Sequence, residues 1–352
     1  MGNIKAVFVG TGMIGAGLAA NAMLNGYQTV LYDVVPHEKM RQNISHILDI
    51  LVGAGAATRE QADAALNACH FSNDLEDAVK GANFVQECIP ERLELKKSTY
   101  ATIQKVTGPD AIICSSTSKL FPTKLQEGSL YPQSILVGHP YNPAYLLPLI
   151  ELCGGEQTAP EAIEKAKEIY TGMGKVAVVC KKEIYGFIVN RLSWAALDAA
   201  KECVRDGVCS VEDMDKAIMF GPGMRMAVTG QLLTISLGVE GGFRAIADKY
   251  GEESTPWNEV YAQGVDEEIA NRDPPLATRS TVCANSGITP SPSCSSFISY
   301  SKFVSALQQA IVYCPISATT RPKSPCNLAK SSSLHLASAL HNPLMEIEIT
   351  KN

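Results

Sequence analysis

The first 33 residues alternate between apolar runs and short polar or glycine-rich breaks. An apolar run from Ile4 to Val9 is typical of a strand buried on both faces, and a glycine-rich turn follows it at residues 10–15. An alanine-rich stretch of helical character then reaches Asn25, and residues 28–32 form a second short apolar run. The pattern therefore predicts a strand, a tight turn, a helix and a second strand in succession.

Later segments extend this arrangement over residues 1–184. Short apolar runs predict further strands at residues 84–88, 111–115, 135–138, 149–152 and 176–180, with helices between several of them. Strands that alternate with helices in this way favour an α/β fold built on a doubly wound, mostly parallel sheet of the Rossmann type.

The pattern changes near Tyr185 to long helical stretches, expected at residues 186–205, 211–220 and 227–249. We therefore predict a second, smaller, all-helical domain over residues 185–273. The helical pattern ends before Pro274.

Residues 274–352 form an atypical tail. They contain no Asp or Glu before Glu346, many serines and prolines, and four of the eleven cysteines. The stretch 275–282 can be encoded by nucleotides whose neighbouring frame reads IGNTVDG, so we hypothesise a frameshift near Pro274. A biased but natural extension is the alternative.

Composition and charge narrow the class of protein. A hydrophobic fraction of 46% and a charged fraction of 19% are those of a soluble globular protein. The formal net charge is -6, which argues against nucleic acid and anionic membranes as the main partners. The cysteines include no CxxC pair and the chain shows no secretory context, so we expect reduced thiols, no metal site and a cytoplasmic location.

The glycine-rich turn is a candidate cofactor site. Gly10, Gly12 and Gly15 enclose Met13 and Ile14 in a GxGxxG pattern between the first predicted strand and helix. Such glycines permit a tight turn and close approach of the backbone to a pyrophosphate, whose negative charge is favoured at the helix amino terminus.

Asp33 ends the second predicted strand, eighteen residues beyond Gly15. A carboxylate at that place can accept hydrogen bonds from a ribose diol and would repel a 2′-phosphate, so the sequence favours NAD over NADP. Helix capping or simple solvation is the alternative role for this side chain.

His139 and Glu151 are the candidate acid–base pair. His139 lies between Gly138 and Pro140 at a predicted strand end, and histidine is the side chain whose ordinary pKa suits proton transfer near neutrality. A carboxylate on its second ring nitrogen would fix the tautomer and stabilise the imidazolium. A core or surface histidine and a strand carboxylate paired with a surface base are the alternatives.

Residues 1 to about 273 resemble the L-3-hydroxyacyl-CoA dehydrogenase superfamily. The resemblance rests on the order and spacing of the segments GTGMIG, QECIPERLELK, SSTSKL, GHPYNP with IEL, and GFIVNR. It implies that His139 takes the proton of a 3-hydroxyl group while hydride passes to NAD. It further implies an orienting role for Glu151 and homodimerisation through the helical domain.

The resemblance also assigns further residues. Ser118 and Asn190 match residues that contact the substrate oxygen, and Glu91, Lys96 and Asn142 match residues around the cofactor. A strand-end turn, a helix cap and ordinary solvated side chains are the respective alternatives. Ser116 departs from the asparagine that acyl-CoA enzymes usually carry there.

The substrate is expected to be a small free hydroxy acid. An acyl-CoA site should offer clustered basic residues, yet residues 43–74 contain only Arg59. The segments GPGMR (221–225), EGG (240–242) and HPYNPAYLLP (139–148) resemble the branch that holds L-carnitine dehydrogenase, L-gulonate 3-dehydrogenase and lambda-crystallin.

Arg225 is our candidate partner for the substrate carboxylate, with a helix-surface salt bridge as the alternative. A trimethylammonium group would favour aromatic faces, for which Tyr145, Trp194 and Phe220 are candidates. An L-3-hydroxyacyl-CoA dehydrogenase and a crystallin-like structural NAD-binding protein remain the alternative functions.

Overall fold

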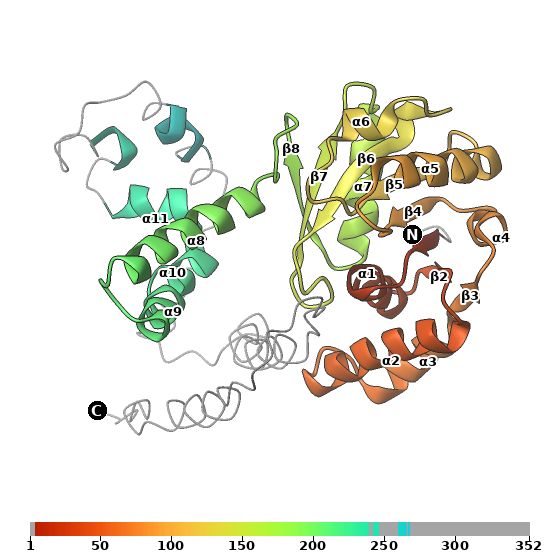
Figure 1. The fold of residues 1–352 in the computed structure, drawn as a ribbon, viewed down its shortest axis with the longest axis horizontal. Helices are drawn as coiled ribbons and strands as arrows, with labels where there is room; N and C mark the ends of the chain where they lie inside the picture. Colours follow the sequence, from red (N-terminus) through yellow and green to blue (C-terminus); the bar gives the residue numbers. More distant parts are fainter. Residues whose placement is uncertain (1–3, 239–241, 246–259, 266, 268–352) are drawn as a thin grey trace. The chain divides into compact units, whose positions relative to one another are not determined.

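The computed structural model describes residues 4–238, 242–245, 260–265 and 267 (Figure 1). The tail predicted at residues 274–352, with the hypothesised frameshift near Pro274, lies outside these residues. Within the described part of the chain, no helix is long and apolar enough to cross a membrane.

An eight-stranded sheet has the order β3-β2-β1-β4-β5-β6-β7-β8. Strands β1 to β6 run parallel, β7 is antiparallel to β6, and β8 is parallel to β7. The strands are β1 (Lys5–Val9), β2 (Gln28–Tyr32), β3 (His70–Ser72), β4 (Phe84–Glu87), β5 (Ile112–Ser115), β6 (Ile135–Pro140), β7 (Leu149–Gly154) and β8 (Val176–Cys180). The predicted doubly wound, mostly parallel sheet is confirmed.

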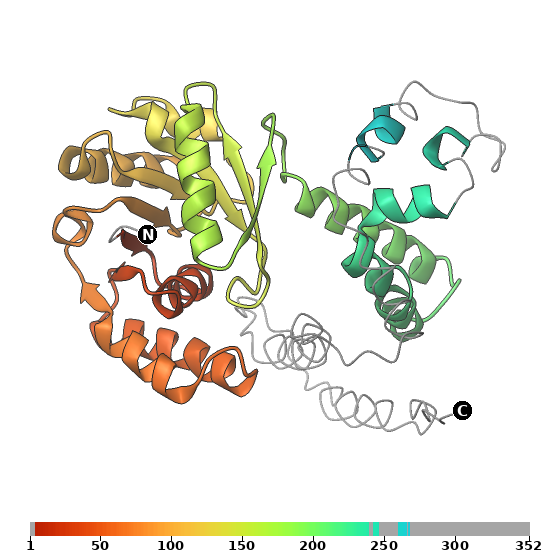
Figure 2. The ribbon, with the colours of Figure 1, turned by 180° about the vertical axis from the view of Figure 1, so that it is seen from behind.

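Helices cover both faces of this sheet, as Figures 1 and 2 show. In β1, Phe8 belongs to a core formed with α1, α2, α3 and α7, whereas Val7 and Val9 belong to a second core with α4, α5 and α6. Alternate side chains of the strand are therefore buried on opposite faces, which explains its unbroken apolar run. The helices are α1 (Met13–Leu24), α2 (His37–Gly53), α3 (Arg59–Ala68), α4 (Leu75–Val79), α5 (Leu93–Thr107), α6 (Pro122–Gln126) and α7 (Pro160–Gly172), with a 3-10 turn at Pro132–Ser134.

The helical part of the chain contains α8 (Val189–Arg205), α9 (Val211–Phe220), α10 (Pro222–Thr229), α11 (Gln231–Leu237) and a 3-10 turn at Gly242–Ala245. The prediction of one helix over residues 227–249 is wrong. Gly230 adopts a left-handed φ of 73° and ends α10, because that backbone conformation cannot continue a right-handed helix. The three-residue edge strand β3 was missed because it is too short to show a period.

Candidate active site

The glycine-rich turn fits a dinucleotide. Gly10 has a φ of 96°, and a methyl group on Gly15 would lie 1.9 Å from the Gly10 carbonyl oxygen, so neither position tolerates a side chain. Helix α1 begins at Met13 with Gly12 as its cap and no side-chain hydrogen bond, while the space beside Gly12 is open for 4 Å. The glycines therefore leave room for a pyrophosphate to approach the backbone at the amino end of α1, where the helix dipole favours negative charge.

Asp33 directly follows β2 and is oriented by the glycine-rich turn. Its Oδ2 atom accepts hydrogen bonds from the Thr11 backbone N–H at 2.6 Å and the Thr11 hydroxyl at 2.8 Å. Its Oδ1 atom accepts from the Val34 N–H at 2.7 Å. The carboxylate is thus fixed beside the pyrophosphate site, at the strand end where a ribose is expected.

His139 and Glu151 are directly paired across the antiparallel strands β6 and β7. Antiparallel partners project to the same face of a sheet, and the Nδ1 atom of His139 lies 2.8 Å from Oε2 of Glu151 with both side chains buried. An ionised carboxylate can only accept, so Nδ1 donates this hydrogen bond, and in the neutral imidazole the lone pair then lies on Nε2. The Ser118 hydroxyl lies 3.2 Å from Nε2.

The other carboxylate oxygen of Glu151 is held by the start of α8. It accepts hydrogen bonds from the backbone N–H groups of Ile188 and Val189 at 2.8 and 2.9 Å. These donors fix the orientation of the carboxylate at the amino terminus of the helix. Glu151 therefore joins the histidine to the helix that carries Asn190.

A cavity of about 250 Å³ brings several predicted site residues together. Its lining combines the glycine-rich turn, the strand ends and α8: Ile14, Ser116, Ser118, His139, Pro140, Tyr141, Asn142 and Asn190. The Tyr141 hydroxyl lies 2.7 Å from that of Ser193 on α8. A second cavity of about 360 Å³ shares Ile14, Ser116 and Ser118 and adds Cys88, Ile89, Glu91, Lys96 and Lys119.

Arg225 is exposed on α10 and does not line either cavity. Its predicted contact with a substrate carboxylate stays a prediction. The suggestion that Tyr145 forms part of a substrate wall is wrong, since its side chain is buried in the sheet core and packs against Gly17 of α1. Trp194 stacks on Tyr185 with ring centroids 5.6 Å apart, and Phe220 is exposed on α9.

Glu91 organises the turn that contains Ser118. Its Oε1 atom accepts hydrogen bonds from the Thr117 hydroxyl and from the backbone N–H groups of Ser118 and Lys119, both at 3.2 Å. Its Oε2 atom lies 3.6 Å from the Lys96 ammonium. Glu91 thus places Ser118 beside His139, whereas its predicted contact with the cofactor stays a prediction.

A buried charge cluster beneath the second cavity was not predicted. The fully buried carboxylate of Glu87, at the end of β4, lies 2.5 Å from the Lys96 Nζ atom and accepts from Tyr100 and Ser115 at 2.5 and 2.7 Å. Burial and the neighbouring Glu87 charge raise the pKa of Tyr100 well above its usual range. The nearest sequence signal is an acid placed at the end of an apolar run.

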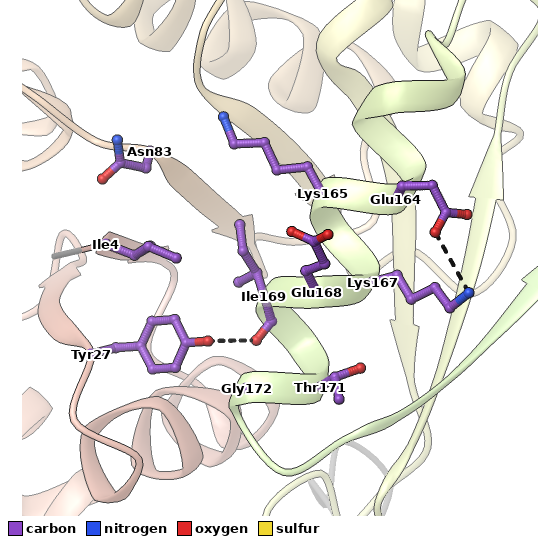
Figure 3. A pocket seen from close by; sticks show the side chains of 10 residues that line it. All are labelled: Ile4, Tyr27, Asn83, Glu164, Lys165, Lys167, Glu168, Ile169, Thr171 and Gly172. Atoms are coloured by element: carbon purple, nitrogen blue, oxygen red, sulfur yellow. Dashed lines mark hydrogen bonds and ion pairs between the residues drawn. The ribbon is translucent and has the colours of Figure 1, made fainter. Parts of the chain in front are cut away.

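A larger hollow of about 690 Å³ lies elsewhere in the sheet domain (Figure 3). Ile4 and Asn83 place it at the amino ends of β1 and β4, whereas the site described above lies at the carboxyl ends. Several of its polar side chains are paired: Tyr27 donates to the Ile169 carbonyl at 2.9 Å (Figure 3), and Lys165 donates to that of Asp110 at 3.1 Å. Ligands of open α/β sheets bind at the carboxyl ends.

Comparison with known proteins agrees with the geometry. Residues 5–184 match the NAD-binding domain of 3-hydroxyacyl-CoA dehydrogenase, and residues 186–273 match its C-terminal domain. The chain belongs to the 3-hydroxyacyl-CoA dehydrogenase family. It is therefore an oxidoreductase that acts on a CH–OH group with NAD.

Relatives of known activity include several L-carnitine dehydrogenases. One from Pseudomonas sp. is 40% identical over 265 residues, covering 74% of this chain and 81% of the relative. One from Bacillus cereus is 37% identical over 272 residues, covering 76% and 82%.

Two solved structures share the fold. 5-Formyl-3-hydroxy-2-methylpyridine-4-carboxylic acid 5-dehydrogenase has a TM-score of 0.63 and 28% identity, covering 88% of this chain and 97% of that one. The 3-hydroxybutyryl-CoA dehydrogenase of Escherichia coli K12 has a TM-score of 0.57 and 25% identity, covering 75% and 57%.

Proposed function

We propose that the protein oxidises the 3-hydroxyl group of a small free L-3-hydroxy acid, resembling carnitine or gulonate, to the 3-keto acid with NAD. The observation that carries this proposal is the row formed by Ser118, His139 and Glu151 at the wall of a cavity that also contains Ile14 of the glycine-rich turn. The L-carnitine dehydrogenases among the relatives support the class of substrate.

In this mechanism the substrate hydroxyl takes a place within reach of His139 Nε2 and Ser118. Nε2 accepts the hydroxyl proton, and the resulting imidazolium is stabilised by Glu151 2.8 Å away. When bound, NAD would accept the hydride from the substrate carbon that bears this hydroxyl group. The amide of Asn190 donates a hydrogen bond to the developing carbonyl oxygen without changing charge.

The charges of the chain favour a free acid over a CoA ester. Arg59, the only basic residue between positions 43 and 74, is paired with Asp49 at 2.6 Å and Asp63 at 3.2 Å. Its guanidinium is therefore already compensated, whereas CoA phosphates need clustered cations. For the carboxylate of a free acid the candidate is Arg225, whose guanidinium offers bidentate geometry and, because it lines neither cavity of its own chain, would approach the substrate from a partner subunit.

We also propose a homodimer formed through the helical domain. Large apolar side chains are exposed on its helices, including Leu192 and Leu197 on α8, Val211 and Phe220 on α9, and Leu232 on α11. Exposed apolar side chains on several helices of one domain favour association. A concentration-independent monomer in sedimentation would contradict this part of the proposal.

The test of function is a parallel assay of NADH formation. L-Carnitine, L-gulonate, L-3-hydroxybutyrate and L-3-hydroxybutyryl-CoA are compared by kcat/KM at saturating NAD. We expect one of the free acids to exceed the CoA ester by at least roughly tenfold, which corresponds to about 1.4 kcal/mol. A preference for the CoA ester would overturn the proposed substrate class.

Arg225→Met separates the role of the carboxylate from that of the hydroxyl. Loss of a charge-assisted contact should raise KM for acids by roughly ten- to a hundredfold and leave carboxylate-free analogues nearly unchanged. Equal losses for acids and neutral analogues would reassign Arg225 to structural support, and no loss for either would remove it from the site.

A further inference from the structure

We infer that Lys175 is a positioning residue that anchors the loop at residues 141–148 between the two members of the histidine–carboxylate pair. The inference rests on the NAD-linked activity proposed above. Lys175 lies between α7 and β8, outside both cavities. Its side chain is only 5% exposed.

The Lys175 ammonium donates two hydrogen bonds to the loop backbone. Its Nζ atom donates to the carbonyl of Ala144 and to that of Leu147, the latter at 3.1 Å. The backbone N–H of the next residue, Val176, donates to the Pro148 carbonyl at 2.8 Å. One segment therefore binds three carbonyl groups within five residues of the loop.

No carboxylate compensates this buried charge in the contacts just described, so the arrangement is costly. Burial lowers the pKa of Lys175 from 10.5 to about 8. A lysine is seldom buried in this way for stability alone, because an apolar side chain of the same shape would avoid the desolvation. What the ammonium provides is three directed hydrogen-bond donors at the centre of a turn.

The anchored loop connects the two halves of the site. At its start, Tyr141 and Asn142 line the cavity with His139. In its middle, the Ala144–Tyr145 backbone lies against Gly17 of α1, where a methyl group would approach Tyr145 to 3.3 Å. The Asn21 side chain of α1 donates to the Tyr145 carbonyl at 3.3 Å.

These contacts hold the loop between Lys175 on one side and the helix of the glycine-rich turn on the other. Without the ammonium, the buried Ala144 carbonyl and the partly buried Leu147 carbonyl lose their donor, and the loop must move to regain water or another partner. Asn142 and the part of α1 that contains Gly17 and Asn21 then shift together. Since β6 and β7 remain paired, His139 and Glu151 keep their contact, and the loss falls mainly on cofactor binding.

The test compares Lys175→Met with Lys5→Met. Lys5 also donates to a backbone carbonyl, that of Lys80 at 2.6 Å, and burial also lowers its pKa, but it lies at the amino end of β1. NADH affinity is measured by fluorescence titration of the full chain at a temperature where circular dichroism shows each variant folded. We expect Lys175→Met to raise Kd for NADH roughly tenfold or more, and Lys5→Met to leave it within about twofold.

A folded Lys175→Met protein with an NADH Kd within about twofold of wild type would overturn the inference. If Lys175→Met does not fold, Lys175→Gln carries the same test, because its shorter amide retains donors but cannot reach both carbonyls. A Kd that rises severalfold supports the inference, and an unchanged Kd overturns it.

A second readout separates positioning from general loosening of the fold. With whichever substrate the parallel assay identifies, KM for NAD should rise by a larger factor than kcat falls in Lys175→Met. The reverse order would overturn the inference. NADH binding needs no substrate, so the failure of every hydroxy acid would contradict the proposed function while the Kd comparison would still decide the role of Lys175.

Discussion

Removing one member of the buried Glu87–Lys96 pair should destabilise the protein far more than removing both charges. In Lys96→Met, the Glu87 carboxylate keeps its hydrogen bonds from Tyr100 and Ser115 but loses its counter-ion 2.5 Å away. Both side chains are 1% exposed or less, so water cannot replace the lysine. Breaking a buried pair in this way costs roughly 3 to 5 kcal/mol.

The double variant Lys96→Met with Glu87→Gln distinguishes charge from packing. A glutamine at position 87 still accepts from Tyr100 and Ser115 with its one oxygen and no longer needs a cation, although it loses the hydrogen bond that the Ile89 N–H donates to the other oxygen of Glu87 at 2.8 Å. The free energy of unfolding, measured by urea titration near neutral pH, should therefore recover by at least about 2 kcal/mol relative to Lys96→Met. Lys97→Met, which removes the partially exposed partner of Glu127, serves as the control and should cost far less.

Two results would refute this reasoning. A loss below about 1 kcal/mol for Lys96→Met would mean that Glu87 tolerates burial without its cation, contrary to the general penalty for an unpaired buried charge. Additive losses in the double variant would mean that the two residues contribute by packing alone. If the folded Lys96→Met protein binds NADH with a higher Kd than wild type, that result would support the predicted contact of Lys96 with the cofactor.

Three further outcomes test the cofactor site and the buried lysine. Gly15→Ala places a methyl group 1.9 Å from the Gly10 carbonyl oxygen and should abolish measurable NADH binding. Gly53→Ala, whose methyl group meets nothing within 4 Å, should leave NADH binding intact. Equal NADH affinities of the two variants would contradict the steric argument. Asp33→Ser should narrow the ratio of kcat/KM for NAD over NADP, and an unmodified protein that uses both equally would count against Asp33. Folding lowers the pKa of Lys175 from 10.5 to about 8, so between these pH values the unfolded state binds more protons than the folded state. The difference in unfolding free energy between wild type and Lys175→Met should therefore shift in favour of wild type by about 2 to 3 kcal/mol from about pH 7 to about pH 10. A difference that does not change with pH would contradict the burial of the charge.

The sheet was predictable because its central strands are buried on both faces. Continuous apolar runs such as Ile112–Ser115, all of whose residues are buried, then coincide with the strands themselves. The short edge strand His70–Ser72 lacks such a run, since its first residue is exposed. The helix expected from residue 227 was misjudged because the backbone conformation of Gly230, rather than apolar periodicity, decides where α10 ends.

The candidate site was predictable for those residues whose type suits the chemistry and whose position also belongs to a sequence motif. His139 and Glu151 were paired from residue type and spacing, and the antiparallel register of β6 and β7 gives that pairing its geometry. The roles of Glu87 and Lys175 were not predictable, because each depends on contacts that form only when separate elements of the fold pack together. A buried ionisable residue carries no local pattern that separates it from an exposed one.

Substitution of His139 tests the central claim most directly. His139 is assigned to proton transfer and not to cofactor binding. His139→Gln should therefore lower kcat on the order of 10²-fold or more, while Kd for NADH stays within about twofold of wild type. Glu151→Gln should lower kcat in the same direction, because the imidazolium loses its carboxylate. Near-normal turnover in His139→Gln, with the best hydroxy acid and saturating NAD, would contradict the assignment of His139 as the base.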